Sequence, residues 1–286
     1  MSVRVICDSA CDVPVDVQER YHIRVVPLDV RVGSREMSTA TTDSEQFWDV
    51  VAQEGEKPQT AAPPPARIEA LVRPLVEAGH EVLALTLTGK LSAVHRSFVL
   101  AAEAFGQQMR VFDTQNLSLG AGVQVIAAAR WATEGRPMAE ILHRLQALRE
   151  RVKLQAVLDT LDWAERGGRI AYLMPLIRRT TRVFRVKVLL HVLGGEVRLL
   201  GVQRSWRSGV KMLVQHTLDL APLEALWVVH TRRGSEAHTL ARHLAEAMGW
   251  PPDRVRVQEA GPVLAAHVGP GALATVAVIR SSKGQM

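Results

Sequence analysis

The first half of this 286-residue chain alternates short apolar segments with segments whose apolar residues recur at helical spacing. Residues 3–6 and 82–87 are short and apolar, as buried strands are. Residues 68–76 between them carry the stripe of an amphipathic helix, which Pro74 is expected to kink. Parallel strands need crossover connections, which helices usually supply. The pattern therefore predicts an α/β fold with a parallel sheet and helices on both of its faces.

Other segments of this half fit the same pattern. Residues 23–32 alternate apolar and polar side chains and predict a strand. Thr42 and Glu45 have the spacing of a capping box, which predicts that a helix begins there. A strand is also expected at residues 110–113, and helices are expected at residues 92–105, 119–131 and 137–152.

The second half has a different pattern. Residues 183–191 and 196–202 are expected to be strands, and Gly194-Gly195 between them suits a tight hairpin turn. Further strands are expected at residues 225–230, 254–258 and 272–279, and a helix at residues 235–248. This pattern predicts a mixed α+β domain. We therefore expect two domains, residues 1–155 and 156–286, in line with about 100–200 residues per domain.

The composition excludes several classes of protein. The net charge is +6, but aromatic residues make up only 5% of the chain and do not alternate with basic ones, so we expect no nucleic-acid partner. Cys7 and Cys11 are too few for a disulfide-rich scaffold. They are expected to be small buried residues, with a redox pair as the alternative.

Targeting segments are not expected either. Asp8 interrupts the first apolar segment before the core of a signal peptide could form. The longest apolar segments, such as residues 271–279, are shorter than the roughly 20 residues of a membrane helix. We expect a cytoplasmic protein without stable membrane insertion.

Common catalytic motifs are missing from the sequence. Gly89-Lys90 is followed by Leu91 and lacks the upstream glycine of a phosphate-binding loop. There is no G-x-S-x-G elbow and no H-E-x-x-H motif. His238 and His243 are five residues apart, which separates them around a helix. We therefore expect no metal site and no cofactor.

Small polar residues remain at the ends of the predicted elements. Asp8 and Ser9 follow the first strand, and Thr60 precedes a proline-rich segment. Ser92 stands where the cap of the next helix is expected. His267 lies just before the last strand. Each of these residues by itself is consistent with an ordinary turn, loop or helix cap.

Taken in order, these segments resemble the DegV family of bacterial fatty-acid-binding proteins. CDSACDVP at residues 7–14 is similar to the family's T-D-S-x-x-D-L-P, and KLSAVHRS at residues 90–97 is similar to K-L-S-G-T-Y-Q-S. HVGPG at residues 267–271 is similar to H-T-G-P-G. Shorter similarities are VPL at residues 26–28, PQTAAP at 58–63, FDT at 112–114 and RGGRI at 166–170.

The resemblance implies two domains, an α/β domain followed by an α+β domain, with one long-chain fatty acid in the cleft between them. It implies that Thr60, Ser92 and His267 hold the carboxylate of the ligand. The chain departs from the family pattern where Ala93 and Val94 replace Gly-Thr, which removes one hydroxyl group. Supporting positions expected beside the ligand are Ser9, Ala93, Val94 and Gly269.

The resemblance also implies that the protein is a carrier without catalytic residues, which presents its ligand to a fatty acid kinase. A run of basic residues from Arg166 to Lys187 contains no acidic residue and is typical of a solvated or docking surface. The residues expected on a surface for the kinase are Arg169, Arg178, Arg179 and Arg204.

Two alternatives remain open from the residues alone. The first is a serine hydrolase or acyltransferase in which Ser92 is the nucleophile, His267 the base and Asp8 the residue that orients it. The second is a nucleic-acid-binding or regulatory module that uses the basic surface.

Overall fold

The computed structural model describes residues 2–281 except residues 167, 169, 174, 176 and 178–185. The chain divides into two compact units. Unit 1 comprises Met1–Arg149, Gly194–Glu196 and Gly261–Leu264. Unit 2 comprises Glu150–Leu193, Val197–Ala260 and Ala265–Met286. The domain boundary expected near residue 155 stays a prediction.

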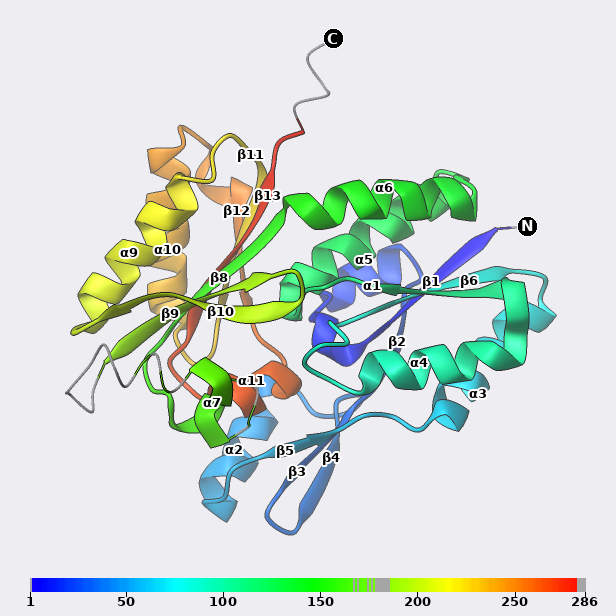
Figure 1. Ribbon diagram of the computed structural model, residues 1–286, viewed down its shortest axis with the longest axis horizontal. Helices are drawn as coiled ribbons and strands as arrows, with labels where there is room; N and C mark the ends of the chain where they lie inside the picture. The colour runs from blue at the N-terminus through cyan, green and yellow to red at the C-terminus, as the bar shows by residue number, and fades with distance from the viewer. Residues whose placement is uncertain are drawn as a thin grey trace. The chain divides into compact units, whose positions relative to one another are not determined.

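Unit 1 is built around a four-stranded parallel sheet with the strand order β2-β1-β6-β7. Helices α3 and α4 cover one face of this sheet and α5 covers the other (Figure 1). The predicted parallel sheet with helices on both faces is therefore confirmed. The bounds of these elements are β1 Val3–Asp8, β2 Arg24–Val26, β6 Glu81–Thr86, β7 Met109–Asp113, α3 Pro65–Glu77, α4 Val94–Ala102 and α5 Ser118–Thr133.

A small antiparallel sheet, in the order β4-β3-β5, also belongs to unit 1. The single strand expected at residues 23–32 is two strands, because Pro27 has no N–H to donate. The next residue, Leu28, donates its N–H to the hydroxyls of Ser9 and Thr39, at 3.1 and 3.0 Å, and not to the carbonyl of a neighbouring strand. The strands of this sheet are β3 Asp29–Val32, β4 Arg35–Ser38 and β5 Gln59–Ala61.

The helix after this hairpin, α2 (Ser44–Glu54), begins one residue later than predicted. Its capping box consists of Asp43 and Gln46, so the expectation of Thr42 and Glu45 was wrong by one residue. A carboxylate at the cap position accepts the Gln46 N–H at 2.8 Å. The remaining helices of this half are α1 Val15–Arg20, α6 Met138–Arg151 and the 3-10 helices η1 Ser9–Cys11 and η2 Glu103–Gln108.

Unit 2 contains a six-stranded mixed sheet in the order β10-β9-β8-β13-β11-β12. Strand β13 is antiparallel to both of its neighbours, and β12 is parallel to β11. Gly194 and Gly195, which join β9 and β10, have φ of 57° and 83°, so the predicted tight turn is confirmed. The strands are β8 Val152–Leu158, β9 Lys187–Leu193, β10 Glu196–Gln203, β11 Leu223–His230, β12 Val255–Glu259 and β13 Leu273–Ile279.

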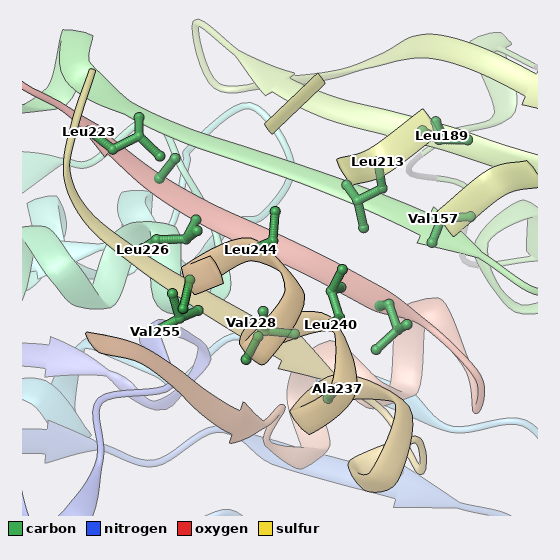
Figure 2. Close-up of a cluster of buried hydrophobic side chains, with 14 residues drawn as sticks. Val157, Leu189, Leu213, Leu223, Leu226, Val228, Ala237, Leu240, Leu244 and Val255 are labelled. Atoms are coloured by element: carbon green, nitrogen blue, oxygen red, sulfur yellow. The ribbon is translucent and has the colours of Figure 1, made fainter. Parts of the chain in front are cut away.

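Helices α9 (Trp206–Leu218) and α10 (Gly234–Ala247) pack on this sheet through a cluster of buried aliphatic side chains (Figure 2). Leu213 and Leu244 at the centre of the cluster are completely buried. Helix α9 and strand β8 were not predicted from the sequence. The short helices are α7 Asp162–Arg166, η3 Ala171–Leu173, η4 Pro252–Arg254 and α11 Pro262–Val268.

The helices of the described residues were also compared with the dimensions of a bilayer. None of them is both long enough and apolar enough to cross a membrane.

Replacing Gly122 with Ala should destabilise unit 1. A Cβ at Gly122, within α5, would lie 2.3 Å from the backbone oxygen of Cys11, which cannot move aside as a side chain could. We expect the free energy of unfolding, measured by urea denaturation, to fall by about 1–3 kcal/mol.

Gly234→Ala is the matched control, since a Cβ at the first residue of α10 would meet only the ring of His230 at 3.7 Å. This variant should leave the free energy of unfolding unchanged or raise it by up to about 1 kcal/mol. Equal losses in the two variants would contradict the role assigned to the close approach at Gly122.

Candidate functional site

The carboxyl ends of the parallel strands in unit 1 meet at a topological switch point. The chain passes from β1 to β2 on one side of the sheet centre, whereas β6 pairs with β1 on the other side. Ligands of open α/β sheets bind at the carboxyl ends of the strands beside such a point. Asp8, Thr86 and Asp113 end β1, β6 and β7 there.

The carboxylate of Asp8 is completely buried and connects the loops after β1 and β6. Its Oδ1 accepts the Ala10 N–H at 2.9 Å, and its Oδ2 accepts the Leu87 N–H at 2.8 Å. Burial raises the pKa of Asp8 to about 7, although the two backbone hydrogen bonds oppose this rise. Both of these hydrogen bonds come from backbone N–H groups, whereas the acid of a catalytic triad binds the imidazole that it orients, so this geometry disfavours that role for Asp8.

A second buried carboxylate, that of Asp12, joins segments distant in the sequence. It accepts the Ser118 hydroxyl at 2.5 Å and the Gly261 N–H at 3.0 Å. Burial raises its pKa to about 6, and both hydrogen bonds oppose the rise. Cys7 and Cys11 lie beside these carboxylates as buried free thiols, and burial raises the pKa of Cys11. The thiols are small buried residues, as expected, and are not in a disulfide.

Replacing Asp8 with Asn should flatten the pH dependence of stability. The pKa of Asp8 is about 7 in the folded protein and about 3.9 in an unfolded chain. The folded state therefore binds this proton more tightly, so the contribution to stability is present below about pH 4 and is lost as the pH rises toward 7. Between pH 5 and 7, the free energy of unfolding should fall by about 2 kcal/mol more in the wild type than in Asp8→Asn.

Urea denaturation at several pH values measures this difference. Asp49→Asn, which makes the same charge change at an exposed position, is the control and should keep the wild-type pH dependence. An Asp8→Asn variant with the wild-type pH dependence would contradict the raised pKa.

Ser9 and Thr60, two of the predicted site residues, both lie in unit 1. The half-buried Ser9 hydroxyl accepts the Leu28 N–H at 3.1 Å and the Thr39 hydroxyl at 2.7 Å. Thr60 is half-buried at the centre of β5 and pairs with Val30 of β3. Ser9 therefore holds the start of the small sheet on which Thr60 lies.

Ser92 lies between β6 and α4 and is half-buried. Its Oγ accepts the N–H of Val94, the first residue of α4, at 3.3 Å. Ala93 occupies the cap position of this helix, so the predicted cap residue acts one position earlier than a standard N-cap. Ala93 is exposed and Val94 is buried. The Ser92 hydroxyl thus lies at the amino end of a helix.

One imidazole close to Ser92 was missed by the sequence reasoning. His95, in the first turn of α4, has its Nδ1 2.9 Å from the Thr86 hydroxyl at the end of β6. On the other side of the same loop, Asp113 accepts the Gly89 N–H at 3.1 Å. The available signal was the position of His95 in KLSAVHRS, where the family has tyrosine.

In unit 2, the segment that contains His267 ends in a fixed backbone. His267 is half-buried in the last turn of α11. Gly269 has φ of 72°, and a Cβ there would lie 2.5 Å from the ring of Trp163, so only glycine fits. Thr231 donates its hydroxyl to the Gly269 carbonyl at 2.7 Å and accepts the Gly271 N–H on its own carbonyl at 2.8 Å.

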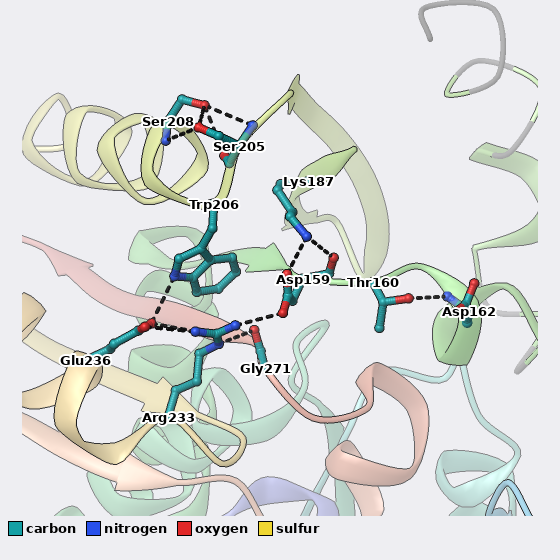
Figure 3. Close-up of polar contacts among 10 residues, drawn as sticks. All are labelled: Asp159, Thr160, Asp162, Lys187, Ser205, Trp206, Ser208, Arg233, Glu236 and Gly271. Atoms are coloured by element: carbon teal, nitrogen blue, oxygen red, sulfur yellow. Dashed lines mark hydrogen bonds and ion pairs between the residues drawn. The ribbon is translucent and has the colours of Figure 1, made fainter. Parts of the chain in front are cut away.

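A charged cluster holds the other side of this segment (Figure 3). Arg233 donates to the Gly271 carbonyl at 3.0 Å and to Asp159 at 2.7 Å, and its guanidinium lies 3.9 Å from the ring centroid of Trp206. Lys187 also binds Asp159. Burial acts to raise the pKa of Asp159, but the hydrogen bonds and charges of Lys187 and Arg233 hold it below its ordinary value.

Unit 2 also contains an apolar pocket of about 450 Å³ between α9 and α10. This volume is in the range of small-molecule sites. The charged Glu236 at its rim accepts the Trp206 Nε1–H at 2.9 Å. The apolar side chains that line the pocket are Trp206, Val210, Val214, Leu240 and Leu273.

Of the four residues expected to face a kinase, the structure describes one. Arg204 is exposed between β10 and α9. Arg169, Arg178 and Arg179 lie outside the described residues. Among the residues that the structure describes, no three His, Cys, Asp or Glu side chains gather as a metal site would require.

The sequence was compared with protein families and with known proteins. The DegV family model matches residues 2–280. A DegV domain-containing protein of Streptomyces coelicolor is 29% identical over 96% of this chain and 97% of its own length. A DegV domain-containing protein of Deinococcus radiodurans is 28% identical over 96% and 97%.

Solved structures match over the same extent. A DegV family protein from Thermus thermophilus, whose structure is described as showing fatty acid binding, is 27% identical with a TM-score of 0.87, over 97% of this chain and 99% of that one. A DegV family protein from Corynebacterium glutamicum is 25% identical with a TM-score of 0.82, over 98% and 99%. With the family model matched along nearly its whole length, this chain belongs to the DegV family.

Proposed function

We propose that this protein binds one long-chain fatty acid and holds its carboxylate with Thr60, Ser92 and His267. The observation that carries the proposal is the match along nearly the whole chain to the fatty-acid-binding Thermus thermophilus protein. The residues at these three positions, two hydroxyls and an imidazole, are the same in type as those of the family motifs.

The chemistry of these residues suits a carboxylate. A carboxylate accepts about four hydrogen bonds and donates none. Its removal from water is unfavourable by several kcal/mol unless donors replace the lost hydration. Hydroxyls, an imidazole and the N–H groups that follow Val94 in the first turn of α4 can supply such donors. Since Ala93 and Val94 carry no hydroxyl, backbone N–H groups have a larger share here than in the family pattern.

The aliphatic chain supplies most of the affinity in this proposal. Each buried methylene contributes about 0.8 kcal/mol, so 14 methylenes contribute about 11 kcal/mol before the entropy lost on binding is subtracted. The polar groups then select for an acid, and an apolar lining takes the tail. Within unit 2, the pocket between α9 and α10 has an apolar lining and a volume suitable for part of such a tail.

Replacing Ser92 and His267 together with Ala should weaken the retention of a fatty acid about tenfold or more, because hydrogen bonds to a charged group contribute about 1.5–3 kcal/mol each. Mass spectrometry of an organic extract of the purified protein identifies the bound acid, and titration with that acid measures affinity. The primary alcohol of the same chain length should lose little affinity, since it carries no charge.

Ser34→Ala with His143→Ala is the control, because it removes the same groups from two exposed positions of unit 1 outside the proposed site. An acid retained equally by wild type and the Ser92/His267 variant would refute the site assignment. An extract without any fatty acid, and no binding on titration, would refute the proposed function itself.

A carrier role follows from the same proposal. The chain carries no nucleophile elbow, phosphate-binding loop or H-E-x-x-H motif. A carrier instead presents the carboxylate to a partner, here a fatty acid kinase that forms the acyl phosphate. Arg169, Arg178, Arg179 and Arg204 are the basic residues proposed to face this kinase, because a surface of one sign attracts a partner of the opposite sign.

Charge reversal by Arg178→Glu with Arg179→Glu should weaken association with the fatty acid kinase of the source organism about tenfold and leave fatty acid retention unchanged. Arg242→Glu with Arg256→Glu makes the same change on exposed residues of α10 and β12 and is the control. Equal kinase affinity for the wild type and the Arg178/Arg179 variant would remove this surface from the proposal.

A further inference from the structure

A cavity in unit 1 lies at the amino ends of the parallel strands, opposite the carboxyl ends that Ser9 and Ser92 follow. It has a volume of about 360 Å³ and lies beside the amino ends of β1 and β2 and the last turn of α3. Nothing in the proposed fatty-acid site uses it. The residues that line it are Arg4, Val5, His22, Arg24, Pro74, Leu75, Ala78 and His80.

Basic side chains gather in this cavity from three segments. Arg24 pairs with Ile6 in the parallel register, and Arg4 is two residues before Ile6, so both arginines lie on the same face of the sheet. His22 is two residues before Arg24. His80, which precedes β6, contributes a second imidazole, and its Nδ1 is 2.8 Å from the Ser2 hydroxyl.

Among the residues that the structure describes, no acidic side chain lines the cavity. Glu81 follows His80, but it pairs with Val3 in register and therefore lies on the opposite face of the sheet from Arg4. Within the described part of the chain, the Arg4 and Arg24 side chains make neither an ion pair nor a hydrogen bond. Two guanidinium groups thus share a cavity without an anionic partner.

The negative ends of two helices offset only part of this positive charge. The helices α1 and α3 end at Arg20 and Glu77, and a helix C-terminus carries about half a negative charge. Two such ends offset about one of the two arginine charges. An excess of positive charge remains in the cavity, and a concave surface of one sign concentrates counter-ions of the other.

We propose that this cavity binds the phosphate group of a small organic phosphate. The guanidinium fork matches phosphate oxygens in geometry, and two arginines with two imidazoles suit a doubly charged group. Leu75, which is buried, and Pro74 of α3 form an apolar wall of the cavity that contacts the organic part of the ligand. A phosphate monoester with an apolar substituent therefore fits better than inorganic phosphate alone.

Isothermal titration calorimetry with phenyl phosphate tests this site. The wild type should bind phenyl phosphate several-fold more tightly than inorganic phosphate and more tightly than benzoate, which has one charge. Arg4→Gln with Arg24→Gln should weaken phenyl phosphate binding at least about tenfold, which corresponds to about 1.4 kcal/mol. Arg110→Gln with Arg242→Gln, at two exposed arginines elsewhere, should retain wild-type affinity.

Three results would overturn the proposal: equal affinity of the wild type and the Arg4/Arg24 variant, an equal loss in the Arg110/Arg242 control, or benzoate bound as tightly as phenyl phosphate. Arg24→Gln alone, at an exposed residue, keeps the test valid if the double variant does not fold. Retention of fatty acid should be the same in all these variants, which separates failure of this site from failure of the proposed function.

Discussion

The architecture of unit 1 depends on a carboxylate that is buried at the end of its first strand. Asp8 accepts one N–H from the turn after β1 and one from the loop after β6. A buried carboxyl is strongly unfavourable without such donors, and its pKa of about 7 shows that the donors offset burial only in part. The interaction holds together the two loops beside the switch point, and these loops carry Ser9 and Ser92.

Asp12 repeats the same principle over longer distances in the sequence. Its carboxylate binds Ser118 at the start of α5 and the backbone of Gly261. Gly122 one turn further along α5 lets that helix approach the backbone of Cys11. The turn that follows β1 is therefore fixed from several sides by hydrogen bonds and close packing, and with it the candidate residue Ser9.

The segment with His267 is positioned by a different device. Thr231 binds the backbone on both sides of Pro270, and Arg233 binds the Gly271 carbonyl while it also pairs with Asp159. The glycines and proline of HVGPG, which by composition suggest a flexible loop, thus form a backbone fixed by hydrogen bonds.

The sequence by itself determined the elements whose signals are local. The strands β1 and β6 are apolar runs, and the Gly194-Gly195 turn needs two residues with positive φ, so each could be predicted without a partner. The order of the family motifs then placed Thr60, Ser92 and His267 as candidate residues. Only the tertiary structure decided that β3 leaves the parallel sheet and pairs with β4 and β5, since such pairing joins segments that are apart in the sequence.

The tertiary structure alone also decided three other features. These are the burial of Asp8, the contact of His95 with Thr86, and the position of Arg4 and Arg24 at one cavity. Burial, pKa shifts and clusters of like charge arise when distant segments pack together. The local periodicity of a sequence does not indicate which distant segments pack together.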